Sequence, residues 1–302
     1  MARRERRNIE EDHSFPEKVK EIVWKDPAIS AKFRPGQRDE TAWIGPRVSY
    51  SCSDAESEDG LPIPPPELWY GYWADSAQYL ASGRKHFRTM MDKLENSGFL
   101  FKERERILDF GCGSGRIIRC FKDLANGREV WGVDINDRHI QWCKEHLCSP
   151  FKFFTSTTFP HLPFEDNYFD IIYAGSVFTH IANLAEAWVL ELKRILNPRG
   201  RIYITIYDNH SIEILLSCPP DSCLHGTALH EQLVACEKEK RFTETGFSKI
   251  VLSRGLDDPV VFYDIESLKS TWENLLKVLF IDQEAFDYQT ALTLSKRTFE
   301  GV

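Results

Sequence analysis

The chain has 302 residues, a length that suits one large domain with an appendage or two small domains. Hydrophobic residues make up 42% and charged residues 28%, which is ordinary for a globular protein and excludes a wholly disordered chain. The net charge of −8 argues against nucleic acid or an anionic membrane surface as partner, because both need clustered cations. A local basic groove is still compatible with this balance.

The sequence also predicts where the protein works. No apolar run approaches the roughly 18 residues that a transmembrane helix needs, so we expect no membrane partner. The N-terminal MARRERRNIEEDH carries basic residues without an apolar stretch behind them, which does not match a secretory signal. The eight cysteines form neither a dense disulfide framework nor a zinc set, so we expect reduced thiols and a cytoplasmic protein.

Residues 1–65 are expected to form a leader, partly disordered, that can cap the site. The stretch SYSCSDAESEDG is poor in apolar residues, whereas Trp24, Phe33 and Trp43 suggest that parts of the leader dock on the rest of the protein. The run LPIPPPE that follows predicts a rigid hinge, because consecutive prolines fix φ and prevent a helix. The second half of residues 67–94 has a helical pattern.

From Arg106 onward, short apolar strands alternate with amphipathic helices. The expected strands are 106–110, 129–135, 151–154, 169–175 and 201–207, and the expected helices between them are 116–124, 137–147 and 184–196. This alternation predicts βαβ units and a parallel sheet that is covered on both faces.

The pattern loosens after Asp208, and we interpret residues 209–245 as an insertion. Order returns with KIVLS, VVFYD and a helix over 265–276. Two apolar runs, 277–282 and 288–296, are joined by a short turn and are expected to pair antiparallel. The predicted fold class is therefore α/β: a Rossmann-like, doubly wound, mostly parallel sheet with a C-terminal antiparallel hairpin.

The glycine-rich turn at 111–115 lies between the first strand and a helix, where backbone N–H groups approach a ligand. Asp134 closes the next strand, where a carboxylate can accept both hydroxyls of a ribose. A dinucleotide fingerprint needs a small residue where this chain has Arg116, and the phosphate-binding G-x-x-x-x-G-K-[ST] loop is missing. The pattern therefore favours a nucleoside other than a dinucleotide across the strand ends.

With these residues in view, the sequence resembles the class I S-adenosylmethionine-dependent methyltransferases. The resemblance is carried by ILDFGCGSGR, VWGVDIN, LPFEDNYFDIIYAGSVFTHI and LKRILNPRGRIYITI, in that order. It is closer to bacterial methyltransferases with PPPE and SGR ahead of the fold, a GCGSGR turn, an SVFTH segment and a terminal Q-x-x-x-x-L strand. It implies a methyltransferase domain over 66–302, with S-adenosyl-L-methionine as cofactor.

The resemblance also implies the cofactor site. The methionine end would lie on the glycine turn, the ribose on Asp134 and the carboxylate near Arg84. Tyr70 or Tyr72 would close over the cofactor, or else only pack on the sheet, and Thr155, Ser156, Thr157 or backbone carbonyls would meet the adenine. The expected cofactor-binding residues are Arg84, Asp109, Gly111, Cys112, Gly113, Gly115, Asp134, Ile135, Thr157 and Ser176.

The acceptor is less specified by the sequence. Residues 174–180 lack the [DN]-P-P-[YF] loop typical of enzymes that methylate nucleobase amines. His180 is the candidate catalytic residue, because an imidazole that titrates near neutrality suits a sugar or phenol hydroxyl; alternatively it only starts the next helix and bonds backbone. No carboxylate cluster accompanies Asp208, so we expect no metal.

The predicted function is therefore methyl transfer from S-adenosyl-L-methionine to a hydroxyl of a small molecule or glycan. The alternatives are methylation of a protein or RNA, and a methyltransferase fold that binds a partner without catalysis. An intact glycine turn and an intact Asp134 favour an enzyme over the non-catalytic alternative. The identity of the acceptor and the oligomeric state stay open.

Overall fold

The computed structural model describes residues 57–69, 73–102, 104–125, 127–238, 249–253 and 259–297. Most of the expected leader lies outside these ranges, including Trp24, Phe33 and Trp43. Tyr70 and Tyr72, the two tyrosines expected near the cofactor, lie outside the described residues as well.

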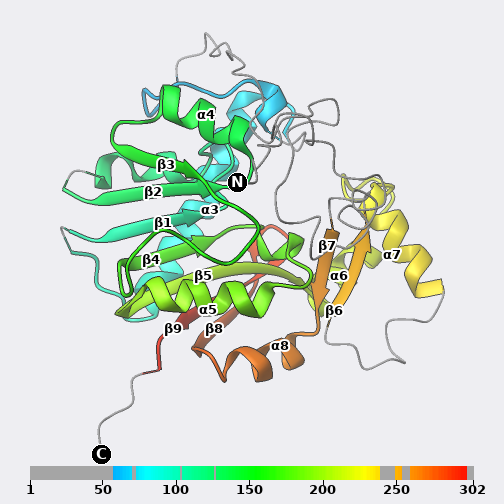
Figure 1. Cartoon of the computed structure of the whole chain (residues 1–302). Coiled ribbons are helices and arrows are strands. Elements are labelled where there is room, and N and C mark those ends of the chain that lie inside the picture. Colours follow the sequence, from blue (N-terminus) through cyan, green and yellow to red (C-terminus); the bar gives the residue numbers. More distant parts are fainter. Residues whose placement is uncertain are drawn as a thin grey trace, which may run out of the picture.

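The described residues form a nine-stranded sheet with helices on both faces (Figure 1). The strands are β1 (Arg106–Phe110), β2 (Glu129–Asp134), β3 (Phe151–Thr155), β4 (Phe169–Ala174), β5 (Leu196–Asp208), β6 (Lys249–Ser253), β7 (Pro259–Tyr263), β8 (Lys277–Phe286) and β9 (Gln289–Ser295). Their order is β3-β2-β1-β4-β5-β7-β6, and β9 pairs with β5 and β8. Strands β1 to β5 pair in parallel, whereas β9 runs antiparallel to both of its neighbours. The predicted fold class, with its C-terminal antiparallel pair, is confirmed.

Several of the helices begin at a side-chain cap. The helices are η2 (Pro66–Leu68), α3 (Ser76–Asn96), η3 (Ile118–Leu124), α4 (Asp137–His146), η4 (Phe178–His180), α5 (Ala185–Ile195), α6 (Asn209–Ser217), α7 (Ala228–Lys238) and α8 (Ile265–Trp272). Asp75, Asn136 and Asp264 accept a backbone N–H bond at the starts of α3, α4 and α8. None of the helices in the described ranges is long and apolar enough to cross a bilayer.

The expected helix over 116–124 is a 3₁₀-helix, η3, in the structure. The N–H of Cys120 bonds the carbonyl of Ile117, three residues back rather than four. Such tighter turns are common in short connecting pieces. The prediction that a helical segment follows the glycine turn is confirmed, and the structure adds that this helix is of the 3₁₀ type.

Successive side chains of the central strands enter two separate cores. Ile107 of β1 joins the core beneath α3, η3 and α4, whereas Leu108 joins the core beneath α5 and α8. Trp142 is a large, fully buried member of the first core and Trp272 of the second. Because both sheet faces are covered, the strands read as nearly continuous apolar runs.

An extension continues the sheet beyond the end of β5. Tyr207 and Asp208, the last residues of β5, pair in parallel with the end of β7. Helices α6 and α7 pack beside them around Leu215, Leu233 and Phe262. Figure 1 shows α6, α7, β6 and β7 gathered on one side of the sheet. This places the extension next to the carboxyl end of β5, where open α/β sheets bind ligands.

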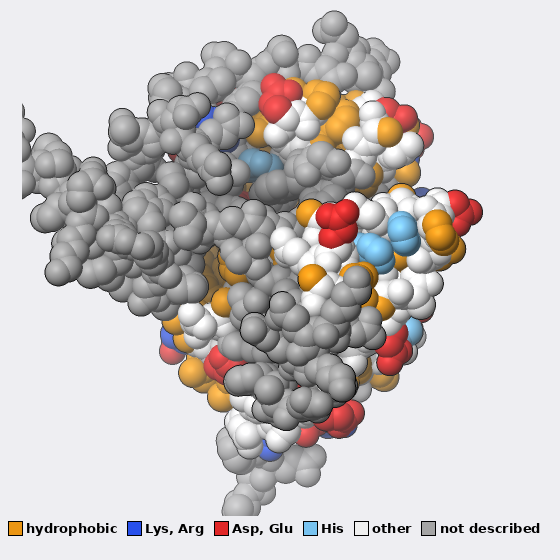
Figure 2. All heavy atoms as spheres, turned by 90° about the vertical axis from the view of Figure 1, so that its right-hand side faces the viewer, with side chains coloured by type: hydrophobic (Ala, Val, Ile, Leu, Met, Phe, Trp, Pro, Cys, Tyr) orange, Lys and Arg blue, Asp and Glu red, His pale blue; other side chains and the backbone are white. Residues whose placement is uncertain are grey.

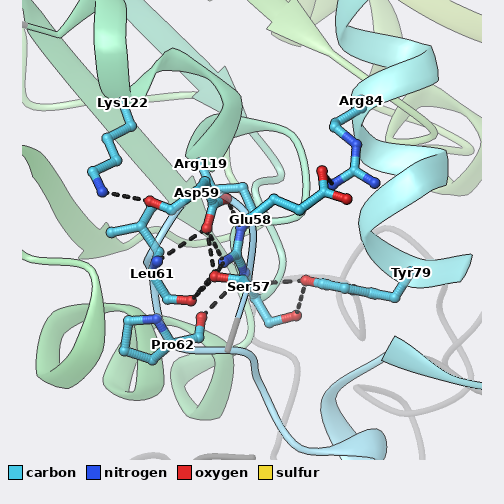
Figure 3. A network of polar contacts seen from close by, with 10 residues as sticks. Ser57, Glu58, Asp59, Leu61, Pro62, Tyr79, Arg84, Arg119 and Lys122 are labelled. Carbon is cyan, nitrogen blue, oxygen red and sulfur yellow. Dashed lines mark hydrogen bonds and ion pairs between the residues drawn. The ribbon is translucent and has the colours of Figure 1, made fainter. Parts of the chain in front are cut away.

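Residues 57–62, part of the expected leader, are held against η3 by hydrogen bonds from one arginine (Figure 3). The side chain of Arg119 is only 1% exposed, and its Nε and Nη2 atoms lie 2.7 and 2.8 Å from the two carboxylate oxygens of Asp59. The same guanidinium donates to the carbonyls of Leu61 and Pro62 at 2.9 and 3.1 Å. Lys122 adds a hydrogen bond to the carbonyl of Asp59. Residues 57–62 are thereby packed against the sheet domain.

Candidate functional site

A cavity of about 800 Å³ lies at the carboxyl ends of the central strands. Its lining comes from the glycine turn after β1, the segments that follow β2, β3 and β4, the start of α3, the β8–β9 turn and the extension. The carboxyl ends of parallel strands meet at one edge of a sheet, which is where such folds hold ligands. The volume is in the range of sites for small molecules.

The glycine turn is shaped for close approach. Gly111 has φ +83°, and a Cβ built there would lie 2.2 Å from Val177. The N–H of Gly113 donates to Oδ2 of Asp134 at 2.8 Å, and the N–H of Asn136 donates to Oδ1 of the same carboxylate at 2.8 Å. Two backbone bonds thus orient Asp134, whose oxygens retain further lone pairs toward the cavity.

Among the carboxyl groups that line the cavity, Asp109 has the most strongly shifted pKa. It is 3% exposed, and burial raises its pKa from 3.8 to about 8. A buried carboxyl group of this kind ionises more readily when a cation lies beside it. Asp109 is therefore suited to face an ammonium group.

Most of the residues predicted from the sequence line this one cavity. They are Asp109, Gly111, Cys112, Gly113, Asp134, Ile135, Thr157, Ser176 and His180. Ser156, one of the three candidates for the adenine contact, lines it too. Strands distant in sequence bring these residues together, because β1, β2 and β4 are neighbours in the sheet.

Two predicted residues, Gly115 and Arg84, lie outside the lining of the cavity, and their cofactor roles stay predictions. Gly115 has φ +85°, and its missing Cβ would lie 2.6 Å from Leu147, so it serves the close packing of α4. Arg84 pairs instead with Glu58 at 3.3 Å, because its place on α3 directs it to the leader and not to the strand ends. Figure 3 shows Arg84 meeting Glu58 beside the Arg119 contacts.

Arg116 is the cation of the cavity that the sequence analysis missed. Its guanidinium lies 4.7 Å from the centre of the Trp73 ring, and Nη1 lies 2.9 Å from Nδ1 of His86. All three residues line the cavity. Arg116 was visible in the sequence, because it stands where a dinucleotide-binding turn has its third small residue. It was used there only to exclude dinucleotide-binding proteins.

The segment before α3 is tied directly to the glycine turn. The Tyr79 hydroxyl lies 2.9 Å from Oγ of Ser114. The Ser114 hydroxyl in turn donates to the carbonyl of Leu68 at 2.8 Å. Burial raises the pKa of Tyr79 well above its usual range, so the residue stays a neutral phenol. Trp69 stacks on Tyr79 with ring centres 5.4 Å apart. Tyr79 lines the cavity together with Trp73.

A closed ring of hydrogen bonds forms where β4, β5 and β9 meet. The N–H of Ser176 donates to Oγ1 of Thr205 at 2.7 Å, and Thr205 donates to Oε1 of Gln289 at 2.6 Å. Nε2 of Gln289 then donates to Oγ of Ser176 at 2.9 Å. Ser176 has φ +58°, a conformation that this ring holds in place. The Gln of the Q-x-x-x-x-L strand thus supports the loop after β4.

His180 lies in η4 and faces the same cavity. Its Nδ1 atom lies 3.1 Å from the carbonyl oxygen of Pro259. Because a carbonyl oxygen only accepts, Nδ1 carries the proton, and Nε2 of the neutral ring is the nitrogen with the lone pair. His180 therefore bonds backbone, as one alternative held, and also lies on the cavity wall in a tautomer that suits a base.

Asp208 has a structural task. It is 1% exposed and caps α6 through the N–H of Ser211, with Ser211 bonding back in a capping box. Across the described ranges, no three His, Cys, Asp or Glu side chains gather as metal ligands would. Metal independence stays a prediction.

The part of the cavity next to the extension is largely aromatic. Tyr207 and Tyr288 stack with ring centres 5.3 Å apart and hydroxyl oxygens 3.2 Å apart. Ile214 and Leu224 of the extension add apolar side chains to the lining. This region suits a flat or apolar small molecule.

Comparison with known proteins agrees with this geometry. Residues 108–204 match the family model described as a methyltransferase domain. This segment runs from β1 to β5 and contains the glycine turn, Asp134 and His180. Over residues 108–204 the chain is therefore similar to methyltransferase domains.

Among curated proteins, the chain is 34% identical over 103 residues to a sterol 24-C-methyltransferase of Schizosaccharomyces pombe, covering 33% of this chain and 27% of that protein. It is 27% identical over 209 residues to an uncharacterised methyltransferase of the same yeast, covering 65% of this chain and 68% of that one. A ubiquinone/menaquinone biosynthesis C-methyltransferase of Burkholderia mallei is 28% identical over 102 residues, covering 33% of this chain and 42% of that protein. The chain thus spans well under half the length of the sterol and quinone relatives.

Among solved structures, a 1,6-didemethyltoxoflavin N1-methyltransferase of Burkholderia thailandensis, with bound S-adenosylhomocysteine, matches at a TM-score of 0.49 and 12% identity. The match covers 77% of this chain and 85% of that one. A Pyrococcus horikoshii protein matches at a TM-score of 0.49 and 19% identity, covering 70% and 91% of the two chains.

Proposed function

We propose that the whole chain is an S-adenosylmethionine-dependent methyltransferase that acts on a small molecule. The observation that carries the proposal is a single cavity at the strand ends that brings Asp109, Arg116 and Asp134 together with His180. We further propose that residues 66–302 act as one domain, with the insertion at 209–245 bordering the acceptor, and that the protein is cytoplasmic.

Each polar group of the cofactor has a matching residue in this proposal. Asp134 accepts the ribose hydroxyls, Asp109 faces the ammonium of the amino-acid end, and Arg116 takes the carboxylate that the sequence analysis gave to Arg84. The adenine lies against Ile135 and Thr157. Opposite charges meet at the amino-acid end, where burial strengthens each contact.

The acceptor in this proposal is a hydroxyl group, and His180 is the base. Nε2 of His180 accepts the hydroxyl proton while the oxygen attacks the methyl carbon, and the carbon–sulfur bond breaks in line to leave S-adenosylhomocysteine. Alignment of the three reacting atoms supplies much of the rate, and the base adds to it because a neutral hydroxyl is a weak nucleophile.

Methyl transfer to carbon is the second candidate. Two relatives are named as C-methyltransferases, of sterols and in quinone biosynthesis. The aromatic wall with Tyr207 and Tyr288 suits such acceptors equally well. A glycan acceptor is less well matched by this apolar wall.

A large anionic acceptor such as RNA is disfavoured. Figure 2 looks onto the side of the molecule that carries the extension, and its coloured surface shows few Lys or Arg side chains among hydrophobic, acidic and histidine side chains. RNA binding relies on clustered cations. This supports a small-molecule acceptor over a nucleic acid.

The test is transfer of an isotopically labelled methyl group from S-adenosylmethionine to a panel of phenols, quinones, sterols and sugars. Mass spectrometry finds the labelled product, and NMR of the methyl carbon distinguishes an O-methyl from a C-methyl group. The proposal expects a labelled O-methyl product. A C-methyl product would favour the second candidate. Binding of the cofactor without methyl transfer to any compound of the panel would favour a non-catalytic role.

A further inference from the structure

A chain of three polar side chains connects the glycine turn, α3 and the β8–β9 turn. Nη1 of Arg116 lies 2.9 Å from Nδ1 of His86. Nε2 of His86 lies 3.1 Å from Oδ2 of Asp287, and Lys85 reaches Oδ1 of the same carboxylate at 2.9 Å. Arg116, His86 and Asp287 all line the cavity. The expected site residues include none of the three.

The chemistry of these groups determines which nitrogen of His86 carries the proton. A guanidinium can only donate, so Nδ1 of His86 accepts from Arg116. Nε2 therefore carries the proton and lies within ion-pair distance of the Asp287 carboxylate, although this contact lacks the angle of a hydrogen bond. Burial lowers the pKa of His86, which keeps the ring neutral, and the contact with His86 holds the pKa of Asp287 well below its usual range. The chain runs from a cation through a neutral ring to an anion.

Packing holds His86 in this orientation. Its side chain is 1% exposed, and its ring stacks on Phe286 with centres 3.6 Å apart. Arg116 is in turn held between the rings of Trp73 and Phe286, at 4.7 and 5.5 Å. A guanidinium on a flexible stem gains a defined direction from such contacts, which reduces the entropy lost on binding an anion.

We propose that His86 and Asp287 are positioning residues that orient Arg116 toward the carboxylate of the cofactor's amino-acid end. This inference rests on the proposed function. It gives the C-terminal hairpin a part in cofactor binding, through a residue that lies about 170 positions from the glycine turn. Gln289 and Tyr288, which follow Asp287, border the acceptor region, so the same turn serves both halves of the cavity.

Two nucleosides separate this effect from a general loss of structure. S-adenosylhomocysteine carries the amino-acid carboxylate, whereas 5′-methylthioadenosine has the same nucleoside and sulfur without the amino-acid end. Dissociation constants for both are measured by calorimetry on the full chain. An effect that passes through Arg116 weakens the first ligand and leaves the second unchanged.

The variants follow from the geometry. His86→Phe keeps a ring against Phe286 but removes both nitrogens, whereas His86→Gln can still accept from Arg116 and donate to Asp287. Asp287→Ala removes the anion from a half-exposed position. Asp287→Gly removes it as well, without the strain that Ala meets at the left-handed φ of +55°. Asp282→Asn is the matched control, because Asp282 also joins the hairpin to α3 through Lys93 but lies outside the cavity lining.

The proposal expects His86→Phe and Asp287→Ala to weaken S-adenosylhomocysteine about tenfold, with methylthioadenosine changed less than twofold. His86→Gln and Asp282→Asn should bind both ligands nearly as the wild type does. Equal weakening of the two ligands, or no change in either, would overturn the positioning role. A wild type that binds neither nucleoside would overturn the proposed function itself, and the two failures are thus distinct.

Discussion

Asp109 illustrates how burial sets the chemistry of a single side chain. The folded protein keeps its proton until about pH 8, whereas the unfolded chain loses it near pH 4. Between these values the unfolded state binds fewer protons, so the contribution of Asp109 to stability falls as the pH rises. Asp109 therefore lowers the free energy of unfolding near neutral pH, which fits a side chain that binds a cationic ligand.

This gives a prediction for Asp109→Asn. An amide does not titrate, so the variant loses the destabilisation that builds up between about pH 4 and pH 8. Its free energy of unfolding relative to the wild type should rise across that window, by at least about 1 kcal/mol at pH 8. Urea unfolding at pH 5 and pH 8 measures the difference, and a relative stability that is constant or declines with pH would contradict the account.

His180 is tested at the same scale. If its Nε2 atom removes the hydroxyl proton, His180→Gln should lower turnover about 10²–10⁴-fold and leave cofactor affinity nearly intact. The matched control is His161→Gln, because His161 is exposed and lies outside the cavity lining. Near-normal turnover of His180→Gln on the identified acceptor would leave alignment alone to explain the rate.

At the scale of elements, the leader is joined to the sheet domain by the Arg119 contacts. Burial opposes ionisation of Asp59, but the bonds from Arg119 prevail and hold its pKa at about 2. The stabilisation is therefore present above about pH 4 and lost as the pH falls toward 2. Leu68, three residues beyond the expected end of the leader, accepts from Ser114 of the glycine turn and lines the cavity, so the leader leads directly into the cavity wall.

We expect Arg119→Leu to destabilise the fold by about 3 kcal/mol, since it leaves a carboxylate and two carbonyls without their buried donor. Arg84→Gln is the contrasting variant: its partner Glu58 is 81% exposed, and such surface pairs contribute about 0–1 kcal/mol. Thermal unfolding compares the two. Equal and small losses would show that the leader packs without help from Arg119.

The elements themselves were largely predictable from sequence. Runs such as RILDF and FDIIYA are apolar at the positions that a doubly covered strand buries, with the exception of Asp109. The turn between 277–282 and 288–296 predicted the antiparallel pair. The 3₁₀ form of η3 was not predictable, because a short helix after a tight turn has no distinct period. Boundaries moved by only a few residues, as in β8, which continues to Phe286.

At the scale of the whole molecule, the strand-end residues of the site followed from local motifs, whereas the residues opposite them did not. Asp109 and Asp134 sit at fixed offsets from their strands. Arg84 was expected near the cofactor from the resemblance and from the attraction of a cation for the carboxylate, but the residue of α3 that lines the cavity is His86, two residues on. His86 acts only through Arg116 and Asp287, and such contacts between distant segments leave no local pattern.

The central claim is that the strand-end cavity binds S-adenosylmethionine, and the most direct measurement is calorimetric binding of this cofactor to the wild type and to Asp134→Ala. The variant removes two charge-assisted hydrogen bonds to the ribose, each worth about 1.5–3 kcal/mol. We predict binding by the wild type and at least a tenfold loss in the variant, with NAD bound more weakly than the cofactor. Unchanged affinity in Asp134→Ala, or tighter binding of NAD by the wild type, would contradict the account.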